Sequence, residues 1–115
     1  MIVMTSKIRV KANKQREFIG IADIIARPTK ASHGCLSYEF FEDPLEPGIF
    51  MFVETWKTWD DLHVHLEKPY TKDFFQALSR FTVEAPTITA YESRGGQPMS
   101  FMNLGSSSHS LDQSR

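Results

Sequence analysis

Two histidines of this 115-residue chain differ in how their neighbours place them. On a helix, His65 shares one face with Leu62 and Leu66, whereas His63 points about 200° away from it, toward water. An imidazole on a buried face can act as a general base near neutral pH. It can equally be a core residue whose ring nitrogens are merely satisfied, and the spacing leaves both interpretations open.

One carboxylate could stand beside that imidazole. Glu54 has the same parity as Phe52 and Trp56 in an apolar stretch, so the three side chains share one face of a strand. If that face meets the helices, the carboxylate lies under His65, where it would orient the ring and raise its pKa. An ordinary structural ion pair would produce the same pattern.

Five aromatic side chains fall on segments that would surround one cavity. They are Tyr38, Phe52, Trp56, Tyr70 and Phe74. Aromatic walls with a few polar groups describe a pocket for a flat organic ring, and a core filled by its own aromatic side chains is the structural alternative. The single cysteine, Cys35, has no partner for a disulfide or a zinc site, and a thiol among apolar neighbours is normally inert. No metal is expected.

The charge balance and the hydropathy argue against several classes of partner. Lys and Arg number 13 and Asp and Glu number 14, so the net charge of -1 lacks the positive field that a nucleic-acid binder needs. No apolar run approaches the ~18 residues of a membrane span, and the first residues do not resemble a signal peptide. We therefore expect a cytoplasmic protein with neither nucleic acid nor membrane as a partner.

Hydrophobic periodicity predicts seven elements in this chain. They are a strand at 2–10, a helix from about 15, strands at 35–42 and 49–56, a helix from about 59, a helix from 70 or 71 to 81, and a strand at 87–91. Pro28 disfavours helix at Arg27, so the first helix is expected to end or kink there. The order β-α-β-β-α-α-β is typical of an α+β, ferredoxin-like fold with a four-stranded antiparallel sheet and helices on one face.

The predicted sheet raises the question of what covers its second face. The strands at 35–42 and 49–56 carry bulky residues at odd and even positions, and the helices can cover only one face. A second copy of the chain is the expected cover, so we predict a homodimer packed sheet against sheet. Residues 1–94 form the predicted domain, and the Gly- and Ser-rich residues 95–115 a C-terminal tail. In that tail Phe101, Met102 and Leu104 form a short apolar cluster that could dock on a neighbouring surface.

Four short motifs occur in the order and spacing of a known family. The first predicted strand ends in Val10-Lys-Ala-Asn-Lys14, a V-K-x-x-K turn, and the second opens on Gly34-Cys-Leu-Ser-Tyr38, a G-C-x-x-Y sequence. The third closes on Glu54-Thr-Trp56, an E-x-W sequence, and His65 follows on the next helix. In these features residues 1–94 resemble the antibiotic-biosynthesis monooxygenase (ABM) family.

The resemblance implies a dimeric α+β barrel of two ferredoxin-like subunits, each with a pocket between sheet and helices. Family members include monooxygenases that oxidise quinols or anthrones with O2 and neither metal nor flavin, haem-degrading enzymes, and enzymes acting on small phosphorylated signalling molecules. The haem degraders pair an Asn on the first strand with a haem-ligating His on the later helix. Here the strand offers Thr5 and Ser6 and the segment 71–81 contains no His, so haem breakdown is not expected.

The sequence and the resemblance together predict a cofactor-independent monooxygenase that oxidises a small aromatic quinol or a related phenolic compound with O2. His65 would be the base, oriented by Glu54. The substrate-binding residues would be Tyr38 and Trp56, which would hydrogen-bond to the substrate oxygens, and Phe52, Tyr70 and Phe74, which would sandwich the ring.

Two other functions stay open. The first is an isomerase or lyase acting on a small metabolite, phosphorylated or not, for which Lys68, Lys72 and Arg80 would form an anion site near the pocket mouth. The second is a non-catalytic dimeric module that binds a small molecule.

Overall fold

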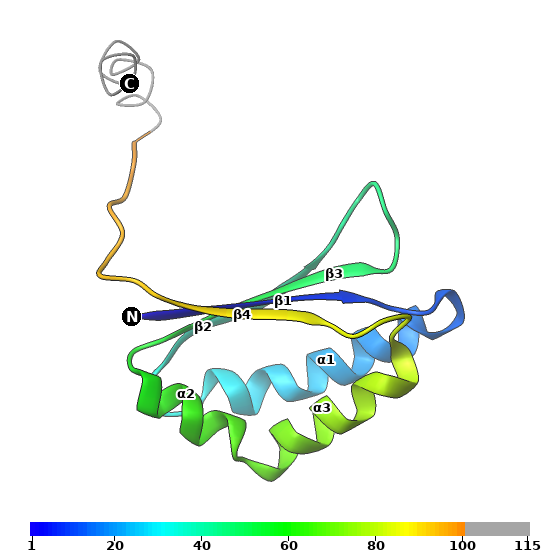
Figure 1. Cartoon of the computed structure of the whole chain (residues 1–115), viewed down its shortest axis with the longest axis horizontal. Helices are drawn as coiled ribbons and strands as arrows, with labels where there is room; N and C mark the ends of the chain where they lie inside the picture. Colours follow the sequence, from blue (N-terminus) through cyan, green and yellow to red (C-terminus); the bar gives the residue numbers. More distant parts are fainter. Residues whose placement is uncertain (101–115) are drawn as a thin grey trace.

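The structure, a computed structural model, describes residues 1–100, so the apolar cluster of Phe101, Met102 and Leu104 lies outside the described residues. The elements are β1 (Ile2–Arg9), a 3-10 turn (Ala12–Lys14), α1 (Gln15–Lys30), β2 (Cys35–Glu42), β3 (Ile49–Trp56), α2 (Trp59–Leu66), α3 (Pro69–Phe81) and β4 (Thr87–Glu92). All three helices lie on one face of the sheet, and the other face is open (Figure 1). The predicted element order is confirmed.

The sheet has the strand order β2-β3-β1-β4, and every neighbouring pair is antiparallel. This is the α+β, ferredoxin-like arrangement that the sequence predicts. The register places Met4 of β1 and Tyr38 of β2 on either side of Glu54, and Ser6 beside Phe52. Because side chains alternate between faces, these residues all point to the helix-covered face.

A bulge at the start of β2 decides which of its side chains reaches that face. The register against β3 shifts between Cys35 and Ser37, so that Leu36 is the extra residue. Without the shift, Ser37 rather than Tyr38 would stand opposite Glu54.

Gly34, immediately before β2, has φ +81°, a conformation that favours glycine. Its carbonyl accepts a hydrogen bond of 2.8 Å from the backbone N–H of Lys57. A Cβ atom built at Gly34 would overlap the side chain of Asp61 in α2. The absence of a side chain at this position therefore lets the first turn of α2 approach the start of β2.

Aromatic rings fill the centre of the layer between sheet and helices. Phe18 of α1 is fully buried, and its ring centroid lies 5.1 Å from Phe50, 6.0 Å from Phe52, 6.3 Å from Phe74 and 6.1 Å from Phe81. Burying each such ring contributes about 1.5–3 kcal/mol, so this cluster is a main source of stability and a rigid support for the residues above it.

The sequence predicts that α1 ends or kinks at Arg27; the helix does not end there but continues to Lys30 with Pro28 inside it. Pro28 lies in the last turn, where the loss of one backbone hydrogen bond is tolerated more easily than in the middle of a helix. Two hydroxyl groups also donate hydrogen bonds to backbone carbonyls of this turn. Thr29 Oγ1 donates to Ile25 O at 2.7 Å, and Ser32 Oγ donates to Pro28 O at 2.9 Å.

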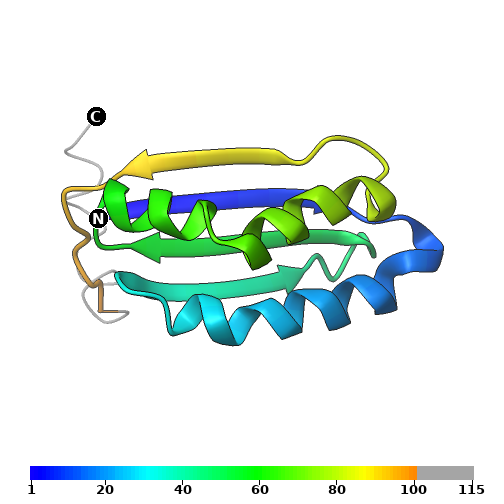
Figure 2. The same cartoon turned by 90° about the horizontal axis from the view of Figure 1, so that it is seen from below.

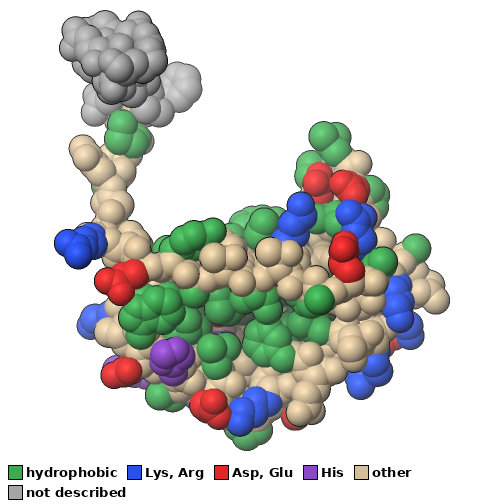
Figure 3. All heavy atoms as spheres, viewed as in Figure 1, with side chains coloured by type: hydrophobic (Ala, Val, Ile, Leu, Met, Phe, Trp, Pro, Cys, Tyr) green, Lys and Arg blue, Asp and Glu red, His purple; other side chains and the backbone are tan. Residues whose placement is uncertain are grey.

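The open face of the sheet mixes apolar and polar side chains. Phe41, Met51 and Tyr91 are exposed there, beside the hydroxyl of Thr5 and the charged Lys7. Hydrophobic side chains are visible along the sheet in Figure 3. The homodimer that would cover this face stays a prediction. Among residues 1–100, no helix is both long enough and apolar enough to cross a bilayer.

Candidate functional site

The floor of the site is one strand. Along the inner face of β3 the sequence runs Phe52, Glu54, Trp56, which changes from apolar to polar within three side chains. Glu54 and Trp56 are both buried, at 5% and 0% exposure. A buried carboxylate is costly unless its hydrogen bonds and its charge are satisfied, so its partners decide what it can do.

The short helix α2 brings the histidine over this floor. The side chain of Thr58 accepts a hydrogen bond from the N–H of Asp61 at 3.1 Å and so caps the helix at the predicted start. The helix phase is as predicted: His65 is 4% exposed, whereas His63 is exposed and its ring stacks against Trp59.

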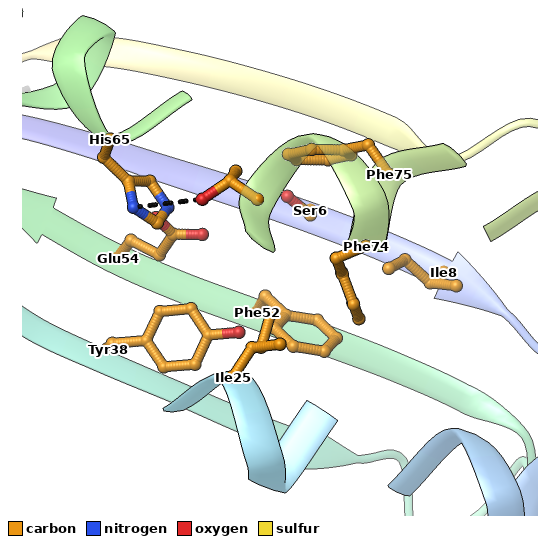
Figure 4. A pocket seen from close by; sticks show the side chains of 10 residues that line it. Ser6, Ile8, Ile25, Tyr38, Phe52, Glu54, His65, Phe74 and Phe75 are labelled. Carbon is orange, nitrogen blue, oxygen red and sulfur yellow. Dashed lines mark hydrogen bonds and ion pairs between the residues drawn. The ribbon is translucent and has the colours of Figure 1, made fainter. Parts of the chain in front are cut away.

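Trp56 contacts both members of the central pair. Its indole Nε1–H donates to Glu54 Oε1 at 3.0 Å, and its ring stacks on the imidazole of His65 with centroids 4.6 Å apart. Glu54 Oε1 lies 3.9 Å from His65 Nε2. Figure 4 shows the carboxyl group beside the imidazole, with one oxygen directed toward the interior of the pocket. Trp56 thereby fixes the position of one carboxyl oxygen and leaves the other free.

Burial dominates the electrostatics of the pair. It raises the pKa of Glu54 from 4.5 to about 7, against the opposing effect of the Trp56 N–H. Burial, and after it the charge of Lys68, lowers the pKa of His65 from 6.5 to about 4. The expectation that the carboxylate would raise the pKa of the imidazole is therefore wrong. At 3.9 Å the two groups are too far apart for a hydrogen bond, and the loss of hydration penalises both charges.

These pKa values show which of the two side chains carries a proton at a given pH. Between about pH 4 and pH 7 the proton resides on Glu54, and both side chains are neutral. Above about pH 7, Glu54 becomes a buried carboxylate beside a neutral imidazole. The other ring nitrogen of His65, Nδ1, faces the hydroxyl of Thr71 in α3 at 3.5 Å.

The pair lies at one end of a small pocket between the sheet and the helices (Figure 4). Its lining is mainly apolar and comes from all layers of the fold: Ser6, Ile8, Ile25, Tyr38, Phe52, Glu54, His65, Thr71, Phe74 and Phe75. Only about 20 Å³ is free for the centres of water molecules, enough for one or two waters.

Two hydroxyls line this pocket near Glu54. Burial, with a smaller effect of Glu54, raises the pKa of Tyr38, so its hydroxyl remains a neutral donor at physiological pH. Ser6 supplies the second hydroxyl, from β1. Both can bind a polar atom of a ligand whose ring lies against Phe52 and Phe74.

Three of the four motifs quoted above, those carrying Tyr38, Glu54 and His65, therefore meet at one place in the fold, whereas the turn at 10–14 lies at the other end of β1. Comparison with known proteins agrees with the resemblance. The profile of a family described as antibiotic biosynthesis monooxygenase matches residues 1–77. The chain belongs to this family. A crystal structure of a "putative antibiotic biosynthesis monooxygenase" from Deinococcus radiodurans superposes on it with a TM-score of 0.82 at 28% identity, covering 87% of this chain and 99% of that one.

Two curated relatives of this ABM chain also align with it. The Bacillus subtilis protein named "Putative monooxygenase YcnE" is 31% identical over 74 residues, which are 64% of this chain and 78% of that protein. An uncharacterized protein of Synechocystis sp. is 32% identical over 91 residues, or 79% of this chain. The alignment spans 62% of the length of the Synechocystis protein.

Not all the predicted site residues of the ABM chain line the pocket. Tyr38, Phe52 and Phe74 line it, as do Glu54 and His65. Trp56 does not, because its ring lies behind the pair and its N–H is used by Glu54.

Tyr70 does not line the pocket either. Its hydroxyl is 3.1 Å from Ser32 Oγ, and since the single proton of Ser32 is donated to Pro28 O, Tyr70 must be the donor. Its ring faces a groove on the outer side of the helices. Its ring also packs edge-to-face against the imidazole of His65, with centroids 6.1 Å apart. Tyr70 thus joins the start of α3 to the turn after α1 and supports His65 from outside the pocket.

Ser6 and Thr71 have pocket roles that the sequence analysis does not predict. Ser6 lies between Met4 and Ile8 among the β1 side chains that point toward the helices. A polar residue at such a core position can be recognised in the sequence and indicates a pocket. Thr71 lies in the first turn of α3, and its hydroxyl reaches His65 in the last turn of α2 across the break between the two helices. No signal in the sequence reveals that contact.

Residues 1–100 offer neither a cluster of metal ligands nor a reactive thiol. No group of three His, Cys, Asp or Glu side chains in that range could hold a metal ion. Cys35 is half-buried, and burial raises the pKa of its thiol, which makes the reactive thiolate scarce. What the site offers is a buried acid-base pair and the three hydroxyls of Ser6, Tyr38 and Thr71 in a mainly apolar pocket.

Proposed function

We propose that this protein is a cofactor-independent monooxygenase that oxidises a small aromatic quinol, or a related phenolic compound, with O2. The observation that carries the proposal is the pairing of a buried carboxyl group, whose pKa lies near 7, with a neutral imidazole at the end of an aromatic pocket. Membership of the ABM family and the name of the Bacillus subtilis relative support the same class of reaction.

The reaction begins with a proton transfer that this pair can carry out. A general base is most effective when its pKa is near the working pH, which favours Glu54 at about 7 over His65 at about 4. Glu54 takes the phenolic proton, and His65 stays neutral beside it. This assignment reverses the roles that the sequence alone suggests.

Oxygen chemistry follows from the anion. The phenolate transfers one electron to O2, which gives a semiquinone radical and superoxide, and the two combine to form a carbon–oxygen bond. Glu54 returns its proton to the peroxide anion that forms, and the hydroperoxide loses water as its O–O bond breaks and the ring C–H proton leaves. One oxygen atom thus enters the product and the other leaves as water. A pocket that excludes bulk water keeps superoxide from being protonated by solvent or lost before it combines with the semiquinone.

The other pocket residues have roles that fit this sequence of steps. The hydroxyls of Tyr38 and Ser6 hydrogen-bond to the substrate oxygens, and Phe52 and Phe74 lie against the faces of the ring. Trp56 positions Glu54 from behind.

A phosphorylated metabolite fits the pocket less well. Among residues 1–100, no Lys or Arg lines the pocket. Lys72 pairs with Glu67 at 2.8 Å on the surface, Arg80 lines only the outer groove, and Lys68, although its charge lowers the pKa of His65, does not line the cavity.

The test measures oxygen incorporation. Purified protein is mixed with a hydroquinone and ¹⁸O2 in the presence of catalase, and the product is analysed by mass spectrometry. We expect one labelled oxygen atom in each product molecule. Oxygen uptake no faster than in buffer would refute the proposal, as would an unlabelled quinone, which indicates an oxidase that reduces O2 without inserting oxygen.

Two matched variants assign the base. Glu54→Gln keeps the shape of the side chain and should lower kcat by ~10²-fold or more, the usual contribution of a general base. Glu39→Gln changes an exposed carboxylate on the neighbouring strand and should leave kcat unchanged. Equal effects of the two variants would exclude Glu54 as the base.

A further inference from the structure

The pocket beside Glu54 is too small for the substrate that it is proposed to bind. An apolar cavity that holds one benzene molecule has about 150 Å³, whereas only about 20 Å³ is free here. A ring can enter only if some part of the wall moves aside. The question is therefore which part of the wall moves most easily, and what lies behind it.

An open groove lies on the outer side of the helices. It is lined by Ile21, Ile25, Tyr70, Asp73, Phe74, Ala77 and Arg80, and it has about 340 Å³ of free space. Figure 2 shows its setting from the helix side, where α1 and α3 run beside one another across the sheet. The groove is predominantly apolar, with one acidic and one basic side chain, Asp73 and Arg80, among its lining residues.

The groove and the pocket share two lining residues, Ile25 of α1 and Phe74 of α3. At this point the wall consists of two side chains from different helices. Ile25 is half-buried, and a rotamer change there breaks no backbone hydrogen bond, whereas Phe74 is buried within the aromatic cluster around Phe18. Ile25 is therefore the side chain that moves aside more easily.

A second depression approaches the pocket from the β2 side and is lined by Lys30 and by five consecutive residues, 35–39. It shares only Tyr38 with the pocket, and it follows the edge of the strand itself. Opening the wall there would disturb the pairing of β2 with β3, whose hydrogen bonds hold the sheet together. The wall between α1 and α3 is therefore the easier one to open.

We propose that the substrate enters through the groove between α1 and α3, that Ile25 moves aside beside the fixed ring of Phe74, and that the groove then holds an apolar substituent of the ring. This inference rests on the proposed function, since it assigns specificity to the same site. The substituent must be uncharged and apolar because the groove surface is mostly hydrocarbon. Ala77 is the specificity-determining residue, since it lines the groove but not the pocket.

The proposal is tested by binding without turnover. Phenol and 4-pentylphenol have the same ring, and their affinities can be measured by calorimetry under nitrogen, so the result does not depend on any oxygenase activity. The wild-type protein should bind 4-pentylphenol at least tenfold more tightly than phenol, because several methylene groups leave water. Equal affinities, or no binding of either phenol, would overturn the proposal.

Substitutions in α3 locate the substituent. Ala77→Trp fills the groove and should abolish the preference for 4-pentylphenol while leaving phenol affinity within a factor of about two. Gln76→Trp places the same side chain at the adjacent exposed position and should keep the preference. If Ala77→Trp does not fold, Ala77→Leu is measured in its place. A preference that survives both changes at position 77 would show that the substituent lies elsewhere.

The role of Ile25 in substrate entry is tested by a separate kinetic measurement. Ile25→Ala should increase the association rate constant of phenol in stopped-flow fluorescence, because one of the two obstructing side chains is shortened. An unchanged rate constant would place the entrance elsewhere. If the binding results are as expected but no quinol is oxidised, the groove assignment stands and the monooxygenase proposal fails. If instead a quinol is oxidised but the binding results are not as expected, only the groove assignment is rejected.

Discussion

Glu54 and His65 should make opposite contributions to the pH dependence of stability. Burial raises the pKa of Glu54 from 4.5 to about 7, so between these values the folded state holds a proton that the unfolded state lacks. The free energy of unfolding then falls as pH rises. Burial lowers the pKa of His65 from 6.5 to about 4, so between these values the unfolded state holds the extra proton. For this group the free energy of unfolding rises with pH.

The size of each effect follows from the same pKa values. Each group spans about 2.5 pH units at about 1.4 kcal/mol per unit, which gives about 3 kcal/mol in either direction. Since the two ranges overlap from about pH 4.5 to 6.5, the effects cancel in the wild-type protein. Burial is the largest cause of each shift, and neither group is a cause of the other's, so each effect should survive removal of its partner.

Single substitutions should therefore reveal both slopes. Urea unfolding of the wild type, Glu54→Gln and His65→Gln is measured from pH 4.5 to 7.5 at one protein concentration. Relative to the wild type, Glu54→Gln should gain about 3 kcal/mol of stability as pH rises, whereas His65→Gln should lose a similar amount. Slopes of the reverse sign would mean that the two residues form a charged ion pair. Parallel curves would mean that neither pKa is perturbed by burial.

Three other predictions follow from the structure and the sequence. Trp56→Phe removes the N–H that favours the charged form of Glu54, so the lower-pH limb of the kcat profile should move to higher pH; an unmoved limb would contradict the positioning role. Sedimentation should give about twice 13.2 kDa, and a stable monomer at micromolar concentration would exclude the sheet-to-sheet dimer. Deleting residues 95–115 should lower Tm by no more than a few degrees, whereas a larger loss would indicate that this segment docks on the folded domain.

The fold was predictable because local patterns along this chain agree with one another. Alternation and helical spacing identify the strands and helices, and they distinguish the buried His65 from the exposed His63. At Pro28 the local rule allowed an end or a kink, and the helix runs on to Lys30 because the proline falls in the last turn, where a lost backbone hydrogen bond is tolerated. The strand parity also placed Glu54 under the histidine correctly.

The chemistry of the site was harder to predict, because it depends on which hydrogen-bond partner each polar side chain has in the folded protein. Trp56 could equally have directed its N–H into the pocket, and only the three-dimensional structure shows that Glu54 takes it. The hydroxyl of Tyr70 is likewise directed away from the pocket, to Ser32, while its ring packs against His65. The direction of the pKa changes depends on how completely the sheet and helices exclude water, which no spacing in the sequence reports.

The close approach at Gly34 has a consequence for how the site tolerates mutation. Any side chain at this position would meet Asp61 and push the first turn of α2 away from the sheet. Since α2 has eight residues and carries His65 in its last turn, a tilt at its start would displace the imidazole from its place over Trp56. A saturation screen for lost oxygenase activity should therefore find position 34 intolerant of every replacement, although Gly34 does not line the pocket.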